Sequence, residues 1–282
     1  MSLEQILKRL RDGAQPDARA SLERFGITAR QAYGWSMPAL RELAREAGRD
    51  HTLAQQLWAT GILDARILAA LVDDPERVTP RQMERWARDF DSWAVCDACC
   101  MHLFDRTPYA HVKVRAWSGR KEEFVKRAAF ALMAALAVHE PDGSDDAFRA
   151  FLPLCEREAG DARNFVKKAV NWALRQIGKR SPGLRTAAIA SAERIAAQDS
   201  PSARWIAADA LRELKSAPAA KERPRTARGN GRNGSSRRAT PAGRGTAKAR
   251  PRRPASPARA KAPTHAPARS GRARPARSGR RS

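Results

Sequence analysis

The chain has 282 residues, and its 54 Lys and Arg outnumber its 30 Asp and Glu to give a formal net charge of +24. This length allows one large or two ordinary domains and a sizeable hydrophobic core. The charge is unevenly distributed, because residues 217–282 hold twenty Lys or Arg and a single acidic residue, Glu222, and so account for +19. Residues 1–216 therefore carry only +5, and we expect a nearly neutral folded domain followed by a basic tail.

The tail over 217–282 consists mostly of Arg, Ala, Pro, Gly and Ser and has no aromatic or large aliphatic residue. Such a segment buries too little apolar surface to offset the entropy of the chain, so we predict that it is disordered. Its charge is typical of an arm that binds polyanions non-specifically through counterion release. The alternative is an Arg/Ala/Pro-rich extension without a specific partner.

The sequence gives no sign of a membrane segment. Its longest uninterrupted apolar run, Ala128 to Val138, has eleven residues, whereas a membrane-spanning helix needs roughly 20. The first residues, Met1 to Arg11, have the pattern of a charged amphipathic helix rather than the apolar core of a signal peptide. We therefore expect a soluble cytoplasmic protein without a membrane partner.

Residues 2–215 have a helical pattern almost throughout, and no alternating strand pattern is visible. We expect about a dozen helices of roughly ten to twenty residues. Short breaks separate them at Phe25-Gly26, Asp73-Asp74-Pro75, Arg106-Thr107-Pro108, Pro141-Asp142-Gly143-Ser144 and Arg180-Ser181-Pro182-Gly183. Antiparallel helix pairs joined by short turns are typical of stacked repeats with a concave surface. We predict an all-α, HEAT-like helical-repeat solenoid, an alpha-alpha superhelix; without a strict sequence period, a compact irregular bundle is the alternative.

The predicted helix from Ser92 to Phe104 is apolar except for Asp97 and the titratable His102. Trp93 and Asp97 are four residues apart and therefore share a face. A carboxylate in such a helix is costly unless it is paired or belongs to a functional site, so Asp97 is a candidate catalytic residue. The alternative is that it caps a neighbouring helix or pairs with an Arg from the next repeat.

The chain has four cysteines, Cys96, Cys99, Cys100 and Cys155, which are too few for a disulfide framework. The spacing Cys96-x-x-Cys99 suggests metal or redox chemistry. However, it lies within a helical stretch that lacks the Gly and Pro turns of a zinc knuckle. We therefore expect packed thiols and no metal site.

The next two predicted helices carry candidate phosphate-binding cations. In the helix Glu122 to Val138, Lys126 and Arg127 precede a wholly apolar stretch, so we expect them at a surface rim. In the helix Ala162 to Lys179, Trp172 lies about 115° from the centre of the apolar stripe. It shares that basic side with Lys168 and Arg175. This combination favours a nucleic-acid surface, and the alternative is an indole that covers Lys and Arg stems.

These helices, taken in order, resemble the DNA alkylation repair glycosylases of the AlkD-like, HEAT-like repeat family. The matching segments are Tyr33-Gly34-x-x-Met37-Pro38-x-Leu40-Arg41, Asp91-Ser-Trp93-Ala-Val-Cys-Asp97, Glu123-Phe-Val-Lys-Arg127 and Asn164-Phe-Val-Lys-Lys-Ala-Val-Asn-Trp172-Ala-Leu-Arg175. The resemblance covers roughly residues 25–215 and excludes the tail. It implies that Trp93, Asp97, Arg127 and Trp172 line a concave site. The sequence departs from the family at Ala94, Cys96 and Lys126.

The resemblance also implies a reaction. Alkylation at N3 or N7 makes a purine a cationic leaving group, so no general acid is needed. Asp97 would stabilise the oxocarbenium character on the deoxyribose and orient the attacking water. Trp93 and Trp172 would pack on the sugar and backbone, while Arg127, Lys126, Lys168 and Arg175 would contact phosphates. The base would remain stacked rather than enter a pocket.

The expected protein is thus a monomeric, monofunctional alkylpurine DNA glycosylase of base excision repair, acting on double-stranded DNA in the nucleoid without a cofactor. No Gly-rich phosphate loop, nucleophile elbow or deaminase motif indicates another enzyme. Two alternatives are a non-catalytic module that binds distorted or branched DNA and a protein-binding scaffold.

Overall fold

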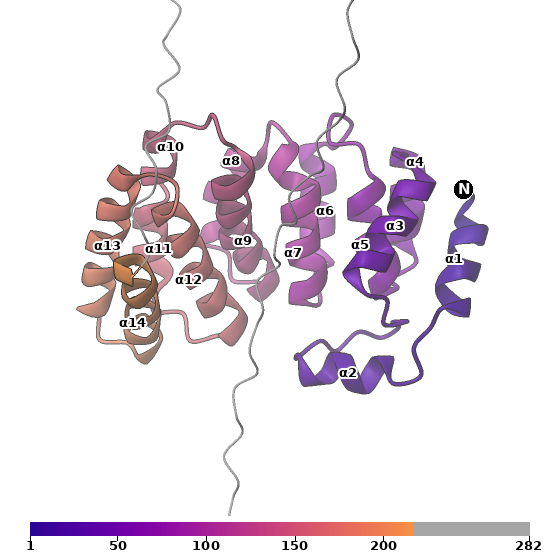
Figure 1. Cartoon of the computed structure of the whole chain (residues 1–282), viewed down its shortest axis with the longest axis horizontal. Helices are drawn as coiled ribbons and strands as arrows, with labels where there is room; N and C mark the ends of the chain where they lie inside the picture. Colours follow the sequence, from indigo (N-terminus) through magenta and orange to yellow (C-terminus); the bar gives the residue numbers. More distant parts are fainter. Residues whose placement is uncertain (217–282) are drawn as a thin grey trace, which may run out of the picture. The chain divides into compact units, whose positions relative to one another are not determined.

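The computed structural model of the chain describes residues 1–216, which form helices and connecting loops without a strand (Figure 1). The predicted disordered tail over 217–282 lies outside the described residues. The helices are α1 (Leu3–Asp12), α2 (Ala18–Arg24), α3 (Met37–Ala47), α4 (His51–Ala59), α5 (Leu63–Val72), α6 (Pro80–Arg88), α7 (Trp93–His102), α8 (Ala110–Ser118), α9 (Glu123–His139), α10 (Asp145–Arg149), α11 (Leu152–Glu158), α12 (Asn164–Gly178), α13 (Pro182–Ala196) and α14 (Pro201–Ser216), with a short 3-10 turn at Phe104–Arg106.

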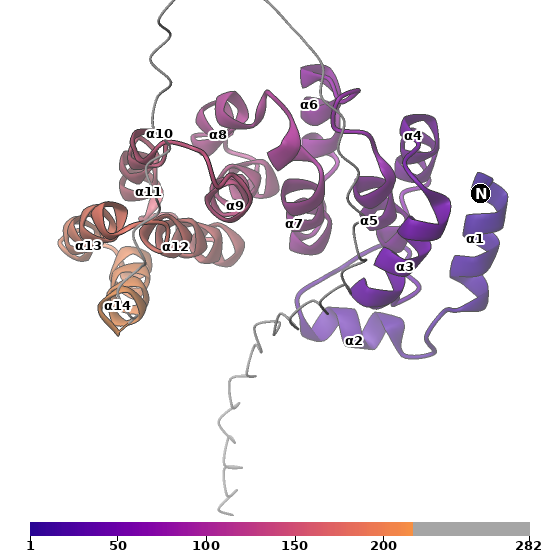
Figure 2. The ribbon, with the colours of Figure 1, turned by 45° about the horizontal axis from the view of Figure 1, so that its top comes forward.

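Five helices form a continuous inner row. α3 packs against α5, α5 against α7, α7 against α9 and α9 against α12. A second set lies beside this row, because α4 packs on α5, α8 on α9 and α13 on α12 (Figure 2). This arrangement of consecutive helix pairs is the stacked helical-repeat fold that the sequence predicts, and it differs from an irregular bundle.

The inner row is held by apolar side chains along its whole length. The centre is α9, in which every residue from Arg127 to Ala137 is buried. α12 packs on α9 and buries Val166, Ala169, Val170, Ala173 and Ile177, the predicted apolar stripe. Outside this row, Trp58 of α4 and Trp86 of α6 stack with ring centroids 4.0 Å apart. The packing of α9 against α7 and α12 positions the three helices that carry the candidate site residues.

The segment that contains α2 is attached differently. Asp64, buried on α5, accepts hydrogen bonds from the backbone N–H groups of Tyr33 (2.6 Å) and Trp35 (2.8 Å) and thereby anchors the loop between α2 and α3. Gly34 in that loop has φ +76°, and a Cβ there would lie only 2.7 Å from the Cβ of Ala18 at the start of α2. This position therefore requires glycine both for its backbone conformation and for its closeness to α2.

None of the helices within residues 1–216 has the length and hydropathy that a membrane-spanning segment needs. The four cysteines are buried and free, as the sequence predicts. Burial raises the pKa of the Cys155 thiol to about 12 and raises those of Cys99 and Cys100 well above the ordinary value. The thiols of Cys99, Cys100 and Cys155 are therefore protonated packing groups at neutral pH.

Candidate functional site

Asp97 and Arg127 form a bidentate ion pair between α7 and α9. Arg127 Nε donates to Oδ1 of Asp97 at 2.9 Å, and Nη2 donates to Oδ2 at 2.7 Å. The remaining nitrogen, Nη1, donates to the backbone carbonyl of Phe165 at the start of α12, at 2.7 Å. Arg127 thus connects three helices of the inner row, and it fixes the plane of the Asp97 carboxylate.

The two partners differ in their access to solvent. The Asp97 side chain is 20% exposed, whereas the Arg127 side chain is buried and only 8% exposed. Burial lowers the pKa of the Arg127 guanidinium, but the charge and hydrogen bonds of Asp97 outweigh this effect and the net change is upward. The structure therefore corrects the expected position of Arg127: it is a buried cation beneath Asp97, not a cation at a surface rim.

Ser92 sets the start of the helix that presents Asp97. Its hydroxyl accepts a hydrogen bond from the backbone N–H of Val95 at 3.5 Å, which caps α7. Trp93 follows and is half-buried, and its indole Nε1 donates to the backbone carbonyl of Phe25 at 3.0 Å. The indole therefore ties the end of α2 to the first turn of α7, one turn before Asp97.

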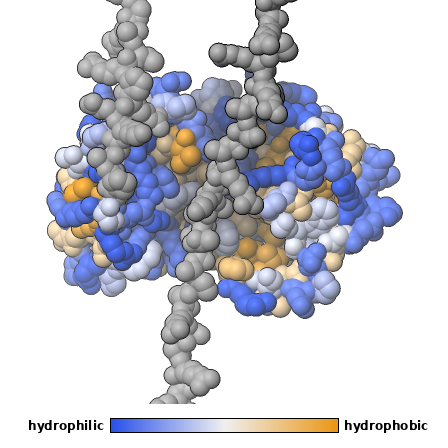
Figure 3. Space-filling view, in the orientation of Figure 1, coloured by the Kyte–Doolittle hydropathy of each residue, from blue (hydrophilic) through white to orange (hydrophobic). Residues whose placement is uncertain are grey.

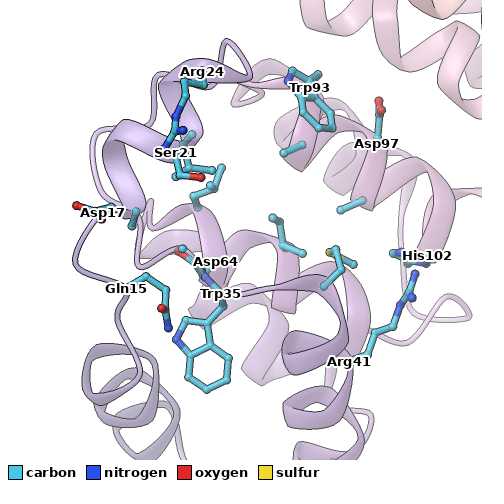
Figure 4. Close-up of a pocket in the computed structure, with 18 of the residues that line it drawn as sticks. Gln15, Asp17, Ser21, Arg24, Trp35, Arg41, Asp64, Trp93, Asp97 and His102 are labelled. Atoms are coloured by element: carbon cyan, nitrogen blue, oxygen red, sulfur yellow. Dashed lines mark hydrogen bonds between the residues drawn. The ribbon is translucent and has the colours of Figure 1, made fainter. Parts of the chain in front are cut away.

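Trp93 and Asp97 line one cavity of about 680 Å³ between α2, α3, α5 and α7 (Figure 4). Leu22, Met37, Leu63, Ile67 and Met101 supply much of its apolar wall. On the face in Figure 3, apolar surface is accordingly visible beside α2, within a mostly hydrophilic surface. The sequence-predicted pair is thus brought to a single concave site.

Polar side chains also line this cavity. In Figure 4, Arg24 lies near Trp93 at one side, and Arg41 and His102 lie close together at another. The pKa of His102 is lowered to about 4 because the ring is buried and because Arg41, Arg106 and His139 add positive charge. His102 is therefore neutral at pH 7 and can both donate and accept a hydrogen bond.

The basic side of α12 lies apart from this cavity. Trp172 is half-buried and packs against the core, and neither it nor Lys168 or Arg175 is among the residues that line the cavity. Lys168 is exposed and has no ion pair within the described part of the chain. Of the predicted α12 cations, it is the one whose charge faces solvent.

Arg175 is already paired with α14, contrary to its expected place on a free basic surface. Its Nη1 forms ion pairs with Asp209 (3.5 Å) and with Glu213. Glu213 also pairs with Lys179. Because the acidic side chains of α14 compensate these cations, this side of α12 is less basic than its own sequence suggests.

Lys126 is likewise not a free cation at a rim. Its side chain is 12% exposed, and its Nζ donates to Glu158 (2.6 Å) and Asp161 (3.0 Å). Both acids precede α12 and follow Lys126 by 32 and 35 residues. The sequence pattern of α9 alone therefore did not reveal them. Lys126 and Arg127 thus both hold neighbouring elements together.

Sequence reasoning missed the residues of the cavity other than Trp93 and Asp97. Trp35, Arg41 and Met37 come from the segment Tyr33 to Arg41, which matches the family, but nothing in their spacing assigned them a site. Arg24 comes from α2, whose role depends on the long-range contact between Phe25 and Trp93. Only the fold brings these segments together.

Comparisons with known proteins agree with this architecture. The chain is similar over 75% of its length to a solved structure described as "A new family of proteins related to the HEAT-like repeat DNA glycosylases with affinity for branched DNA structures". The match covers 95% of that chain with 16% identity and a TM-score of 0.64. A comparison with curated proteins finds no significant match. The family model of the DNA alkylation repair enzyme matches residues 6–214. The chain therefore belongs to the DNA alkylation repair enzyme family.

Proposed function

We propose that this protein is a monofunctional DNA glycosylase that releases N3- or N7-alkylated purines from duplex DNA. The observation that carries the proposal is the carboxylate of Asp97, which two hydrogen bonds from Arg127 hold in a fixed plane at a cavity shared with Trp93. A pre-oriented anion at a partly desolvated position is suited to stabilising positive charge that develops during a reaction.

Hydrolysis breaks the bond between C1′ of the deoxyribose and the purine nitrogen. The electron pair of that bond neutralises the cationic base, which leaves, while positive charge develops on C1′ and the ring oxygen. Asp97 stabilises this charge and orients a water molecule, whose oxygen bonds to C1′ and whose proton passes to solvent through the carboxylate. No external acid is needed because the leaving group already carries the charge.

A second, lyase step requires an amine nucleophile close to C1′. Within the described residues, no lysine lines the cavity that contains Asp97. The cations there are Arg24 and Arg41, and a guanidinium group is unsuited to nucleophilic attack. The product is therefore an abasic site, which is left for other enzymes.

Duplex DNA is held by phosphate contacts and apolar packing. Lys168 is exposed and available for phosphates, and Trp172 on the same helix packs against the backbone of the bound strand. Arg127 acts by positioning Asp97 rather than by touching phosphate. The protein works as a monomer and without a cofactor.

The decisive experiment measures release of 7-methylguanine and 3-methyladenine from methylated duplex DNA. Asp97→Asn keeps the shape of the side chain and removes its charge, so release is expected to stop while duplex affinity persists. The full chain and a variant lacking 217–282 are assayed in parallel, because the basic tail raises affinity for any DNA. Undiminished release by Asp97→Asn would contradict the assignment of Asp97.

A second candidate is binding of branched DNA without chemistry. The structural relative is described as having affinity for branched DNA structures, and the charge of Asp97 is already balanced by Arg127. This candidate predicts tight binding to four-way junctions and no base release under conditions in which a known alkylpurine glycosylase is active. Release of methylated bases by the wild-type protein would exclude it.

A further inference from the structure

We infer that the cavity between α2 and α7 is a binding site for an unpaired, unstacked nucleobase of the DNA strand held beside Asp97. The inference rests on the proposed DNA-binding function, but it is independent of base excision. It concerns a base without a pairing partner, as in a bulge or at a branch, and leaves the alkylated purine in its stack.

The first argument is size and chemistry. A volume of about 680 Å³ is within the range of small-molecule sites and is ample for one nucleobase. The walls provide two indoles, Trp35 and Trp93, together with Met37 and Met101. Aromatic rings and thioethers accept the flat face of any base, so such a site binds bases with little sequence preference.

The second argument is the polar groups. Arg24 and Arg41 lie at separate parts of the cavity edge (Figure 4). No ion pair of Arg41 is found in the described chain, and Arg24 donates only to the carbonyl of Ala20 at 3.3 Å. Both are therefore free to bind the phosphates that flank a base in the cavity. His102 offers a donor and an acceptor for the edge of that base.

The third argument is position. Asp97 and Trp93 belong to the same cavity, so a strand whose sugar contacts Asp97 has its neighbouring nucleotide at the cavity opening. Of the acids that line the cavity, Asp97 is paired with Arg127 and Asp64 accepts two backbone N–H hydrogen bonds, whereas Asp17 is exposed at the edge. A base that lacks a partner can leave the helix and enter the cavity without losing base-pair hydrogen bonds.

Ser21 provides a test that leaves Trp93 and Asp97 untouched. It is half-buried on α2, and its side chain points into the cavity (Figure 4). Ser21→Phe fills the space that a base would occupy. Ala20→Phe is the matched control, because Ala20 precedes Ser21 on the same helix, is exposed and does not line the cavity.

The experiment compares the affinity of the full-length protein for a duplex with a single-nucleotide bulge and for the fully paired duplex. The ratio of the two affinities cancels the contribution of the basic tail. Stacking of one base predicts a preference of about tenfold for the bulge. Ser21→Phe is expected to reduce the ratio to near one, whereas Ala20→Phe retains it.

Photocrosslinking locates the base directly. A 5-iodouracil in the bulge is expected to crosslink to Trp35 or Met37 inside the cavity, and Ser21→Phe is expected to abolish this product. Crosslinks confined to α12, absence of a bulge preference in the wild type, or an unchanged ratio in Ser21→Phe would overturn the inference. If Ser21→Phe loses helical structure, Ala94→Phe from the opposite wall replaces it.

Release of 7-methylguanine from paired duplex, measured on the same proteins, separates the two proposals. Release that persists in Ser21→Phe while the bulge preference disappears supports both. If the wild type releases no base but Ser21→Phe selectively weakens bulge binding, the proposed excision fails and the cavity assignment stands. If release is normal and the bulge preference is insensitive to Ser21→Phe, only the cavity assignment fails.

Discussion

The carboxylate of Asp97 and the guanidinium of Arg127 meet through two parallel hydrogen bonds, with the cation buried and the anion partly open to a cavity. The candidate catalytic group is therefore held from beneath by its own counterion. Arg127 joins α7, α9 and α12 through these contacts. The same contacts orient the Asp97 carboxylate toward the cavity that a substrate would enter.

Arg127→Ala is expected to destabilise the protein by about 3–5 kcal/mol, because it leaves a half-buried carboxylate without its counter-charge and removes the hydrogen bond that joins α9 to the carbonyl of Phe165. Arg127→Lys retains the charge but not the planar fork, so it should recover part of this loss. Urea unfolding followed by circular dichroism measures both. Arg204→Ala, in an exposed pair with Asp199, is the control and should cost less than about 1 kcal/mol.

Removing both partners tests whether the loss comes from the uncompensated charge. The double variant Asp97→Leu/Arg127→Met replaces the pair with apolar side chains, and we expect it to be markedly more stable than Arg127→Ala. Equal instability of the two would mean that the contact with Phe165, rather than the ion pair, dominates.

Trp93→Phe is expected to loosen α2 without unfolding the inner row. The ring remains, but the hydrogen bond from Nε1 to the carbonyl of Phe25 is lost, at a net cost of about 1 kcal/mol. Hydrogen exchange should accelerate in residues 18–27 and remain unchanged in α9. Equal acceleration in both would show that the indole supports the whole fold.

Lys168→Ala and Arg175→Ala should affect different properties of the protein, DNA affinity in the first case and stability in the second. Lys168 is exposed and unpaired among the described residues, so its loss should weaken duplex binding and reduce the slope of log affinity against log salt by about 1. Arg175 is paired with Asp209 and Glu213, so its loss should mainly lower the unfolding temperature. Fluorescence anisotropy over a salt series and thermal unfolding measure the two properties. If Arg175→Ala reduced the salt dependence of DNA affinity more than Lys168→Ala does, Arg175 would be a phosphate contact after all.

His102 predicts a pH dependence of stability. Its folded pKa of about 4 lies below the ordinary value of 6.5 because of burial and nearby cations, so only the unfolded chain binds the proton between these values. The contribution of His102 to the free energy of unfolding is therefore fully present above pH 6.5 and is lost as the pH falls toward 4. With allowance for partial solvent screening, the loss is about 2 kcal/mol. Urea unfolding of the wild type and of His102→Gln is measured from pH 7 to 4.5. The difference between their unfolding free energies at each pH gives the contribution of His102.

The helices could be predicted closely because their signals are local. The expected helix Glu122 to Val138 is α9 (Glu123–His139), and Ala162 to Lys179 is α12 (Asn164–Gly178). Apolar periodicity and the polar breaks determine such boundaries within a few residues. The apolar stripe of α12 was likewise predicted correctly, because it depends only on the rotation per residue.

The environment of the charged residues could not be predicted in the same way. A basic side chain at a helix end has the same pattern whether it faces water or an acid from a distant element. Arg127 meets Asp97 thirty positions away, and Arg175 meets an acid of α14 thirty-eight positions away. The sequence had left open that Asp97 pairs with an Arg of the next repeat, and the structure confirms this alternative while keeping Asp97 at the cavity.

α2 is secured by an indole-to-carbonyl hydrogen bond and by a glycine-dependent loop, whereas α7 is fixed within the inner row. Displacing α2, which forms one wall of the cavity, therefore costs less free energy than displacing α7, which forms the opposite wall. A shift of α2 would change the width of the cavity without moving the Asp97 carboxylate. The cavity would then accept ligands of different sizes, while the Asp97 carboxylate keeps the same position relative to each of them.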